Sequence, residues 1–263
     1  MSKDFETVRL SIEGPVAEVS FCRPEIHNAF NDTLIYEMTE VFQSLKEDKN
    51  LRVVVLTGEG KSFCAGADLN WMRRVKDYSF EKNLEESLAL AELFHLIDRH
   101  PLPVIGRING AAIGGGTGFV SVCDIAVAAE SAKFSFSEVK IGVVPACIGP
   151  YVIKKIGAGR AREFFISGER LTASQANDIG LVNRVSADEQ LNDTVHLLVK
   201  TILSSGPQAI AMAKELIANV PNMGPDKYRP YTAEMIAKLR KSDEGQEGMD
   251  AFLNKRKPNW VIE

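Results

Sequence analysis

The stretch NGAAIGGGTGFVSVCDIAVAA, residues 109–129, decides how the rest of the chain is interpreted. It places five glycines between Gly110 and Gly118 and follows them with an apolar run. A buried strand is predicted over residues 104–108 and a buried helix over residues 114–122. Glycines between a strand and a helix let another group approach the backbone closely, because no Cβ stands in the way. That group is either the phosphates of a dinucleotide or a carbonyl oxygen whose charge changes during a reaction.

A second glycine turn lies upstream of this stretch. FCAGADL, residues 63–69, follows another continuous apolar strand, LRVVVLTG at residues 51–58. Strands and amphipathic helices alternate from here to about Pro145, which predicts an α/β fold with a largely parallel sheet. If both strands belong to one parallel sheet, both glycine turns lie at its carboxyl edge, where ligands bind in open α/β sheets.

The remaining local patterns surround this predicted sheet. They indicate a hairpin at residues 13–15, amphipathic helices over 28–48 and 80–99, and strands over 124–130 and 132–142. Further helices are predicted over residues 150–156, 160–166, 172–179, 187–203, 207–220, 231–240 and 244–255.

Composition excludes several classes of protein. Of the 263 residues, 45% are hydrophobic and 25% charged, which is typical of a globular protein in water. The net charge of −4 and the lack of a basic arm argue against nucleic acid as a partner. No uncharged apolar run of about 18 residues is present, and residues 1–8 do not resemble a signal peptide, so we expect a cytoplasmic protein without membrane contact.

The potential metal ligands and nucleophiles are scattered. The four cysteines and four histidines lack metal-ligand spacing, and no G-x-S-x-G elbow occurs. We therefore expect neither a metal site nor a covalent nucleophile.

Three interpretations of the glycine cluster are open from the residues alone. A dinucleotide site would use Glu138, about 20 residues further on, but the cluster gives no clean G-x-G-x-x-G. Close packing of small residues is the second. In the third, one peptide N–H from each glycine turn converges on a single oxygen. Two such donors, one at a helix N-terminus, form an oxyanion hole for a developing enolate.

Six motifs together resemble the crotonase, or enoyl-CoA hydratase/isomerase, superfamily. They are FCAGADL (63–69), NGAAIGGG (109–116), CDIAVAA (123–129), AKFSFSEVKIG (132–142), LTASQANDIGLV (171–182) and FLNKRKPNW (252–260). The resemblance runs in register from RPEIHNAF, at residues 23–30, to the C-terminus.

This resemblance implies a ClpP-like spiral of repeated ββα units with a C-terminal helical trimerisation region. Residues 1–205 would form the core with the active site, and residues 206–263 the region for trimerisation and CoA contact. The implied partner is an acyl-CoA thioester, in which CoA is part of the substrate and no separate cofactor is needed. The implied assembly is a homotrimer or a dimer of trimers.

The resemblance also implies the site residues. The amides of Ala67 and Gly115 would hold the thioester oxygen, and Glu138 would be the general acid/base. The CoA contacts would be Arg23, Glu25, Ile26, His27, Ala65, Ala67, Asp68 and Leu69, with Phe252 and Lys255 reaching CoA on an adjacent subunit.

Gly118 departs from the family pattern, because hydratases of this family commonly carry a second glutamate at that position. A single base suits either hydration or isomerisation of an enoyl thioester. We expect Gly118 to leave space there, with less repulsion for a substrate that carries its own carboxylate.

The segments at 67–83 and 114–124 are most similar to the bacterial methylglutaconyl-CoA hydratase branch of leucine catabolism. The resemblance therefore implies a hydratase of 3-methylglutaconyl-CoA or a similar branched, carboxylated enoyl-CoA, with Arg73, Arg74 or Lys76 attracting the distal carboxylate. The alternatives are a Δ3-Δ2 enoyl-CoA isomerase that uses Glu138 as its single base, and a non-catalytic CoA-binding subunit.

Overall fold

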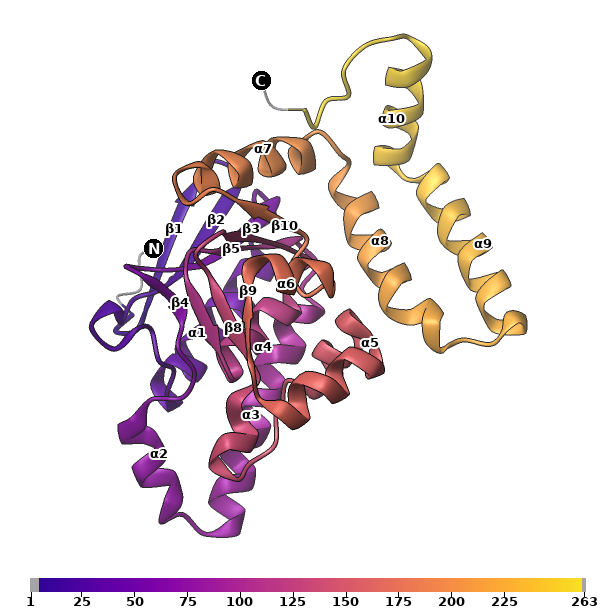
Figure 1. The fold of residues 1–263 in the computed structure, drawn as a ribbon. Helices are drawn as coiled ribbons and strands as arrows, with labels where there is room; N and C mark the ends of the chain where they lie inside the picture. Colours follow the sequence, from indigo (N-terminus) through magenta and orange to yellow (C-terminus); the bar gives the residue numbers. More distant parts are fainter. Residues whose placement is uncertain (1–4, 262–263) are drawn as a thin grey trace.

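The computed structural model describes residues 5–261, so residues 1–4 of the N-terminal segment and residues 262–263 lie outside the description (Figure 1). A six-stranded sheet has the order β1-β2-β3-β5-β7-β10. Its strands are β1 (Val8–Glu13), β2 (Val16–Phe21), β3 (Val53–Gly58), β5 (Val104–Ile108), β7 (Ile125–Ala129) and β10 (Arg184–Ser186). The predicted hairpin is confirmed, since β1 and β2 pair antiparallel, and the other neighbours are parallel.

A second sheet of four short strands accounts for the position of the glycine turns. Its order is β4 (Ser62–Cys64), β6 (Ala111–Ile113), β8 (Lys133–Ser135) and β9 (Arg170–Thr172). Each of β4, β6 and β8 follows a long strand of the first sheet and precedes a helical segment, so the predicted ββα repeat is confirmed. The two buried strands, β3 and β5, are parallel neighbours in the large sheet as expected, but the glycine turns follow β4 and β6 of the small sheet rather than the edge of the large one. Three-residue strands are too short to show a periodic pattern.

Ten α-helices complete the described part of the chain. They are α1 (Asp32–Glu47), α2 (Leu69–Lys76), α3 (Phe80–Asp98), α4 (Gly115–Val122), α5 (Gly149–Ser167), α6 (Ala173–Asp178), α7 (Leu191–Leu203), α8 (Pro207–Asn219), α9 (Pro225–Lys241) and α10 (Asp243–Leu253). Gly157, at φ +78°, interrupts α5, which confirms the two helical segments predicted there.

Two predicted elements differ from the structure. The strand predicted over 132–142 stops at Ser135, and a 3₁₀-helix, η2 (Ser137–Ile141), takes over. Helix α9 begins at Pro225 rather than Tyr231 and continues through Pro230. Pro230 is the sixth residue of α9 and lies inside the helix, where its missing N–H removes one intrahelical hydrogen bond.

The hydrophobic core lies between the two sheets and the helices α1, α3, α4, α5 and α7. Helix α4 is buried on nearly every side, so its glycines lie in the centre of the molecule. The main buried cluster ends at Val199 and includes no residue of α8, α9 or α10. No helix in the described part of the chain is long and apolar enough to cross a membrane.

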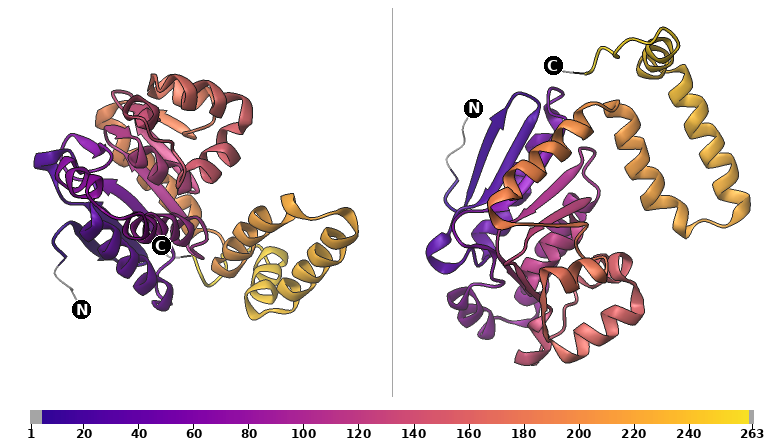
Figure 2. Two further views of the ribbon diagram at one scale, coloured as in Figure 1. Left: turned by 90° about the horizontal axis from the view of Figure 1, so that it is seen from below. Right: turned by 45° about the horizontal axis from the view of Figure 1, so that its top comes forward.

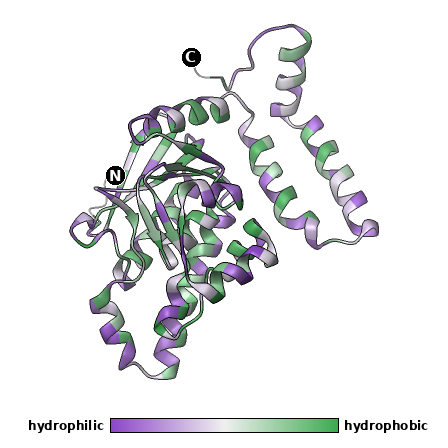
Figure 3. Cartoon of the chain, in the orientation of Figure 1, coloured by the Kyte–Doolittle hydropathy of each residue, from purple (hydrophilic) through white to green (hydrophobic). Residues whose placement is uncertain are grey.

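The three C-terminal helices form an arm, residues 207–253, that projects from the core in all three views (Figures 1 and 2). Hydrophobic and hydrophilic residues alternate along its helices (Figure 3). Lys214 of α8 fastens the arm to the core through an ion pair with Asp124 at 2.5 Å. Phe252 is 83% exposed in this single chain, so the arm presents apolar surface that its own core does not cover.

Candidate active site

The two glycine turns meet because the backbone of one presses against the backbone of the other. A Cβ placed on Gly66 would lie 2.9 Å from the carbonyl oxygen of Ile113, at the end of β6. A Cβ on Gly116 would overlap the carbonyl oxygen of Cys64, at the end of β4. The two turns are therefore in contact, and both glycines are needed for the close approach.

Hydrogen bonds orient the amide of Ala67. The N–H of Phe30 donates to the Gly66 carbonyl at 2.8 Å, and the N–H of Asp68 donates to the Phe30 carbonyl at 2.8 Å. These bonds form a parallel bridge between Phe30 and Ala67. Since successive N–H groups of an extended segment point to opposite sides, the N–H of Ala67 points away from Phe30.

The amide of Gly115 is the first of helix α4. N–H groups in the first turn of a helix have no intrahelical acceptor and lie at the positive end of the helix dipole. Gly114 before it has φ +54° and donates its N–H to the Ser135 carbonyl at 2.8 Å, which fixes the start of the helix. The structure thus presents two backbone donors, Ala67 and Gly115, on adjoining turns.

Glu138 faces this helix start from η2. A Cβ on Gly114 would lie 3.4 Å from Glu138 Oε1. The other carboxyl oxygen, Oε2, is buried and has no hydrogen-bond partner among the described residues. Burial raises the pKa of Glu138 above its ordinary value. A carboxyl group held beside the first turn of α4 also opposes the binding of a phosphate there, which disfavours the dinucleotide interpretation of the glycine cluster.

The space expected at Gly118 is absent. A Cβ on Gly118 would overlap Ile148 Cγ2 and lie 2.9 Å from Phe94 Cζ. Both side chains are buried, Ile148 at the N-cap of α5 and Phe94 in α3. The prediction that Gly118 leaves room beside the site is therefore wrong, because residues distant in sequence fill the volume with apolar atoms.

An aromatic wall continues from this point along the site. Phe94 packs on Phe119 with ring centroids 4.9 Å apart, Phe119 on Phe30 at 6.1 Å, and Phe30 on Trp71 at 5.7 Å. A Cβ on Gly115 would lie 2.6 Å from the ring of Phe30. Sequence reasoning did not assign Phe30, Phe94 or Ile148 to the site, because a single apolar residue carries no signal of which backbone it will meet.

The residues assigned to CoA from the resemblance lie on two connected loops. The side chains of Arg23 and Asp68 form an ion pair at 2.8 Å, and Asp68 also caps α2. The N–H of Ala65 donates to the His27 carbonyl at 3.0 Å. These contacts show that Arg23 and Asp68 join the loops to each other.

The exposed surface of the two loops comes from the other assigned residues. Glu25, His27 and Leu69 are exposed, and Ile26 is half-buried. His27 has φ +56°, and its Nδ1 lies 3.0 Å from Ser62 Oγ. A ligand that approaches these loops therefore meets backbone and exposed side chains rather than the Arg23–Asp68 pair.

Phe252 and Lys255 lie apart from this site within one chain. Both are at the end of α10, on the side of the molecule opposite α2 (Figure 1). Both are exposed. The structure therefore does not bring them to the Glu138 site of their own subunit.

Two thiols and one imidazole are buried in the protein interior. Cys64 and Cys123 are fully buried, and burial raises the pKa of each thiol to about 12. His100 is buried, and burial lowers its pKa to about 4. No group of three or more potential metal ligands occurs within residues 5–261.

Comparison with known proteins agrees with this geometry. The family model for enoyl-CoA hydratase/isomerase matches residues 11–262. The crotonyl-CoA hydratase of Syntrophomonas wolfei is 31% identical to this chain and covers 98% of each sequence. The solved structure of an enoyl-CoA hydratase from Shewanella pealeana has a TM-score of 0.94 at 36% identity, over 97% of this chain and 96% of that one.

A second solved structure, from Legionella pneumophila and assigned as an enoyl-CoA hydratase/isomerase (crotonase), has a TM-score of 0.92 at 41% identity. It covers 98% of this chain and 100% of that one. Since the family model and these relatives span nearly the whole chain, the protein has the crotonase fold and belongs to the enoyl-CoA hydratase/isomerase family.

Proposed function

We propose that the protein is an enoyl-CoA hydratase that adds water across the α,β-double bond of an acyl-CoA thioester, or removes it in reverse. The amides of Ala67 and Gly115 bind the thioester oxygen, and Glu138 is the general acid/base. The observation that carries this proposal is the carboxyl group of Glu138. Its buried Oε2 has no hydrogen-bond partner within residues 5–261 and lies beside the first turn of α4, as a group that exchanges a proton with substrate requires.

The reaction needs one carboxyl group if Glu138 serves twice. Its carboxylate accepts a proton from water as the water oxygen bonds to Cβ. The resulting enolate oxygen is stabilised by the N–H groups of Ala67 and Gly115. Glu138 then returns a proton to Cα, which completes the addition. Burial moves the pKa of Glu138 towards neutral pH. A side chain whose pKa is near the ambient pH both accepts and donates a proton efficiently.

The proposed substrate is a branched, carboxylated enoyl-CoA such as 3-methylglutaconyl-CoA. At position 118, where a second acid would stand, Ile148 and Phe94 pack against a glycine, so a substrate that carries its own carboxylate meets no repulsion from that position. A distal carboxylate needs a cation, and α2 offers three exposed ones. Arg74 pairs with Asp32 at 2.8 Å, and Arg73 donates to Asn70 Oδ1 at 2.8 Å.

The third cation, Lys76, makes no ion pair within residues 5–261 and carries the proposed contact to the substrate carboxylate. The test compares rates with crotonyl-CoA and 3-methylglutaconyl-CoA, followed by loss of absorbance of the conjugated thioester. Lys76→Ala should raise KM for the carboxylated substrate more than KM for crotonyl-CoA. Lys200→Ala, on the exposed side of α7, is the matched control and should change neither. An equal rise of both KM values in Lys76→Ala would refute the contact.

Isomerisation of a 3-enoyl-CoA is the second candidate, favoured by the single carboxyl group at the site. A gain of conjugated absorbance from a 3-enoyl-CoA, without loss from a 2-enoyl-CoA, would establish it in place of hydration. CoA binding without turnover of any enoyl thioester would instead indicate a non-catalytic CoA-binding subunit.

The arm supports a further part of the proposal. Its exposed Phe252, close to Lys255, would reach CoA bound to a neighbouring subunit of a homotrimer or a dimer of trimers. Sedimentation equilibrium measures the assembly, and a monomer at assay concentrations would contradict it.

A further inference from the structure

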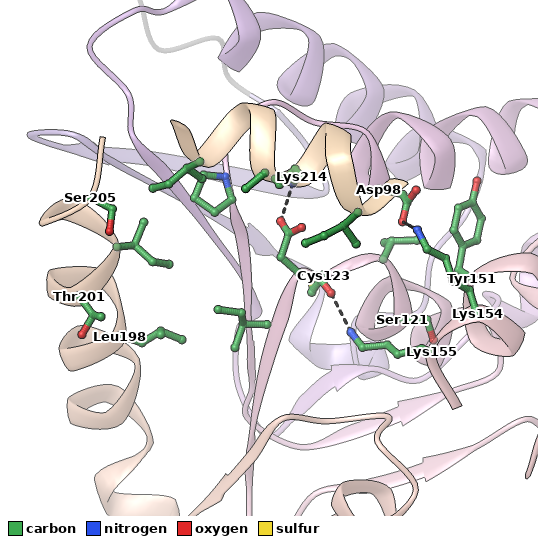
Figure 4. Close-up of a pocket in the computed structure, with 18 residues that line it drawn as sticks. Asp98, Ser121, Cys123, Tyr151, Lys154, Lys155, Leu198, Thr201, Ser205 and Lys214 are labelled. Carbon is green, nitrogen blue, oxygen red and sulfur yellow. Dashed lines mark hydrogen bonds and ion pairs between the residues drawn. The ribbon is translucent and has the colours of Figure 1, made fainter. Parts of the chain in front are cut away.

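The carboxyl end of helix α4 opens on a cavity of about 580 Å³ (Figure 4). The cavity lies between α4, α5, α7 and α8, at the end of α4 opposite Gly115. Its charged lining residues are Asp98, Asp124, Lys154, Lys155 and Lys214. None of them belongs to the proposed chemistry at Glu138.

Lys155 caps the carboxyl end of α4 from the neighbouring helix α5. Its Nζ donates to the carbonyl of Cys123 at 2.7 Å (Figure 4). It also donates to the carbonyl of Val120 at 3.3 Å. The last carbonyls of a helix have no intrahelical donor and form the negative end of its dipole. The ammonium group of Lys155 therefore supplies donors to carbonyls at the carboxyl end of α4 and places a positive charge there.

The other charges around the cavity occur in pairs. Lys214 pairs with Asp124 at 2.5 Å, and Lys154 lies 3.9 Å from Asp98. Among the described residues that line the cavity, Lys155 is the cation without a carboxylate at ion-pair distance. The cluster thus holds one more lysine than carboxylates, and the lysine without a carboxylate is the one bound to α4, where burial lowers its pKa below the ordinary lysine value.

We propose that Lys155 is a positioning residue of the oxyanion hole, which holds α4 in place and adds positive potential at the Gly115 amide. This inference rests on the proposed function. Helix α5 contacts α4 at two places, since Ile148 fills the space at Gly118 and Lys155 binds the last turn. Through these contacts, α5 and its N-cap residue hold α4 near its middle and at its last turn.

The electrostatic effect of the Lys155 charge on an enolate bound at Gly115 is large enough to measure. Eight helical residues span about 12 Å, which puts Nζ about 15 Å from an oxygen bound at Gly115. At an effective dielectric constant of about 20, a unit charge at that distance changes the stability of an enolate about sixfold. Lys155→Met should therefore lower kcat about sixfold and leave KM within twofold.

The decisive readout is spectroscopic and needs no turnover. In a Glu138→Gln background, bound 2,4-hexadienoyl-CoA absorbs at longer wavelength as its carbonyl becomes polarised. Adding Lys155→Met should reduce this red shift, and Lys155→Arg should retain it. Lys154→Met is the matched control, because it removes the adjacent exposed lysine and should leave the red shift unchanged. Lys155→Gln replaces Lys155→Met if the latter does not fold.

The outcomes distinguish the proposed role of Lys155 from the proposed function of the site. An unchanged red shift in a folded Lys155→Met protein, with lower thermal stability only, would overturn the inference and leave Lys155 a structural cap. The absence of any red shift in the Glu138→Gln parent would refute the oxyanion hole, and the inference with it. Full turnover by Glu138→Gln would refute the role of Glu138 while leaving the test of Lys155 intact.

Discussion

Substitutions at Gly118 and Ile148 should be energetically coupled, because the side chain of Ile148 occupies the volume that a side chain at position 118 would need. In Gly118→Ala, the new Cβ overlaps Ile148 Cγ2 and lies 2.9 Å from Phe94 Cζ. Overpacking of this kind costs about 1–3 kcal/mol, against a gain of about 1 kcal/mol from replacing glycine inside a helix. Ile148→Ala alone costs about 2–5 kcal/mol, because it leaves a cavity.

In the Ile148→Ala background the overlap with Cγ2 disappears, and the cavity left by Ile148 gives the Phe94 ring, 2.9 Å from the new Cβ, room to shift, so the helix gain dominates. Gly118→Ala should then be neutral or stabilising by about 1 kcal/mol, which gives a coupling free energy of about 2 kcal/mol. The assay is urea unfolding of the four proteins of the cycle. All are measured at one protein concentration, since assembly would add to the apparent stability. If the two single effects add to the double within about 0.5 kcal/mol, Ile148 does not fill the space at Gly118.

Further predictions concern Glu138, Asp68 and Phe252. Burial raises the pKa of Glu138, so the acidic limb of kcat/KM should fall at a pH above the ordinary glutamate value. The same shift means that folding stability declines as pH rises from the unfolded to the folded pKa, a decline that Glu138→Gln should abolish in urea unfolding. Asp68→Ala removes the N-cap of α2 and the ion pair with Arg23. The free energy of unfolding should therefore drop by about 1–2 kcal/mol, and KM for crotonyl-CoA should rise. An unchanged KM would show that the two loops do not shape the CoA site. Phe252→Ala should raise KM for CoA thioesters without lowering the melting temperature, because the side chain is 83% exposed, and a change in neither quantity would remove Phe252 from the CoA site.

Local signals in the sequence predict those parts of the fold that depend on neighbouring residues. The buried helix predicted from Gly114 begins at Gly115, and the break predicted between two helices lies at Gly157. Each depends on glycine conformation or on hydrophobic periodicity, which a short window contains. The strands β4 and β6 escaped the same reasoning, because three residues contain no period and these strands exist only through their pairing.

The same distinction between local and long-range signals holds for the residues of the candidate site. The turns that carry the proposed backbone donors, and Glu138, lie in recognisable motifs, and the structure brings these segments into contact. The contact between Gly118 and Ile148 joins residues 30 positions apart, and the Arg23–Asp68 pair joins residues 45 apart. Neither contact leaves a signal in the local sequence, so a glycine at position 118, where a second acid would stand, predicts an open space. The structure shows instead that Ile148, at the N-cap of α5, and Phe94, in α3, fill this space.

The account depends most on Glu138 as the group that transfers the proton. The direct measurement is steady-state hydration of the preferred enoyl-CoA by Glu138→Gln, together with the Kd for CoA. Since a positioned general acid/base contributes about 10²–10⁴ in rate, kcat should fall by that factor while the Kd for CoA stays within about threefold. Hydration by Glu138→Gln within about threefold of the unmodified protein would contradict the account.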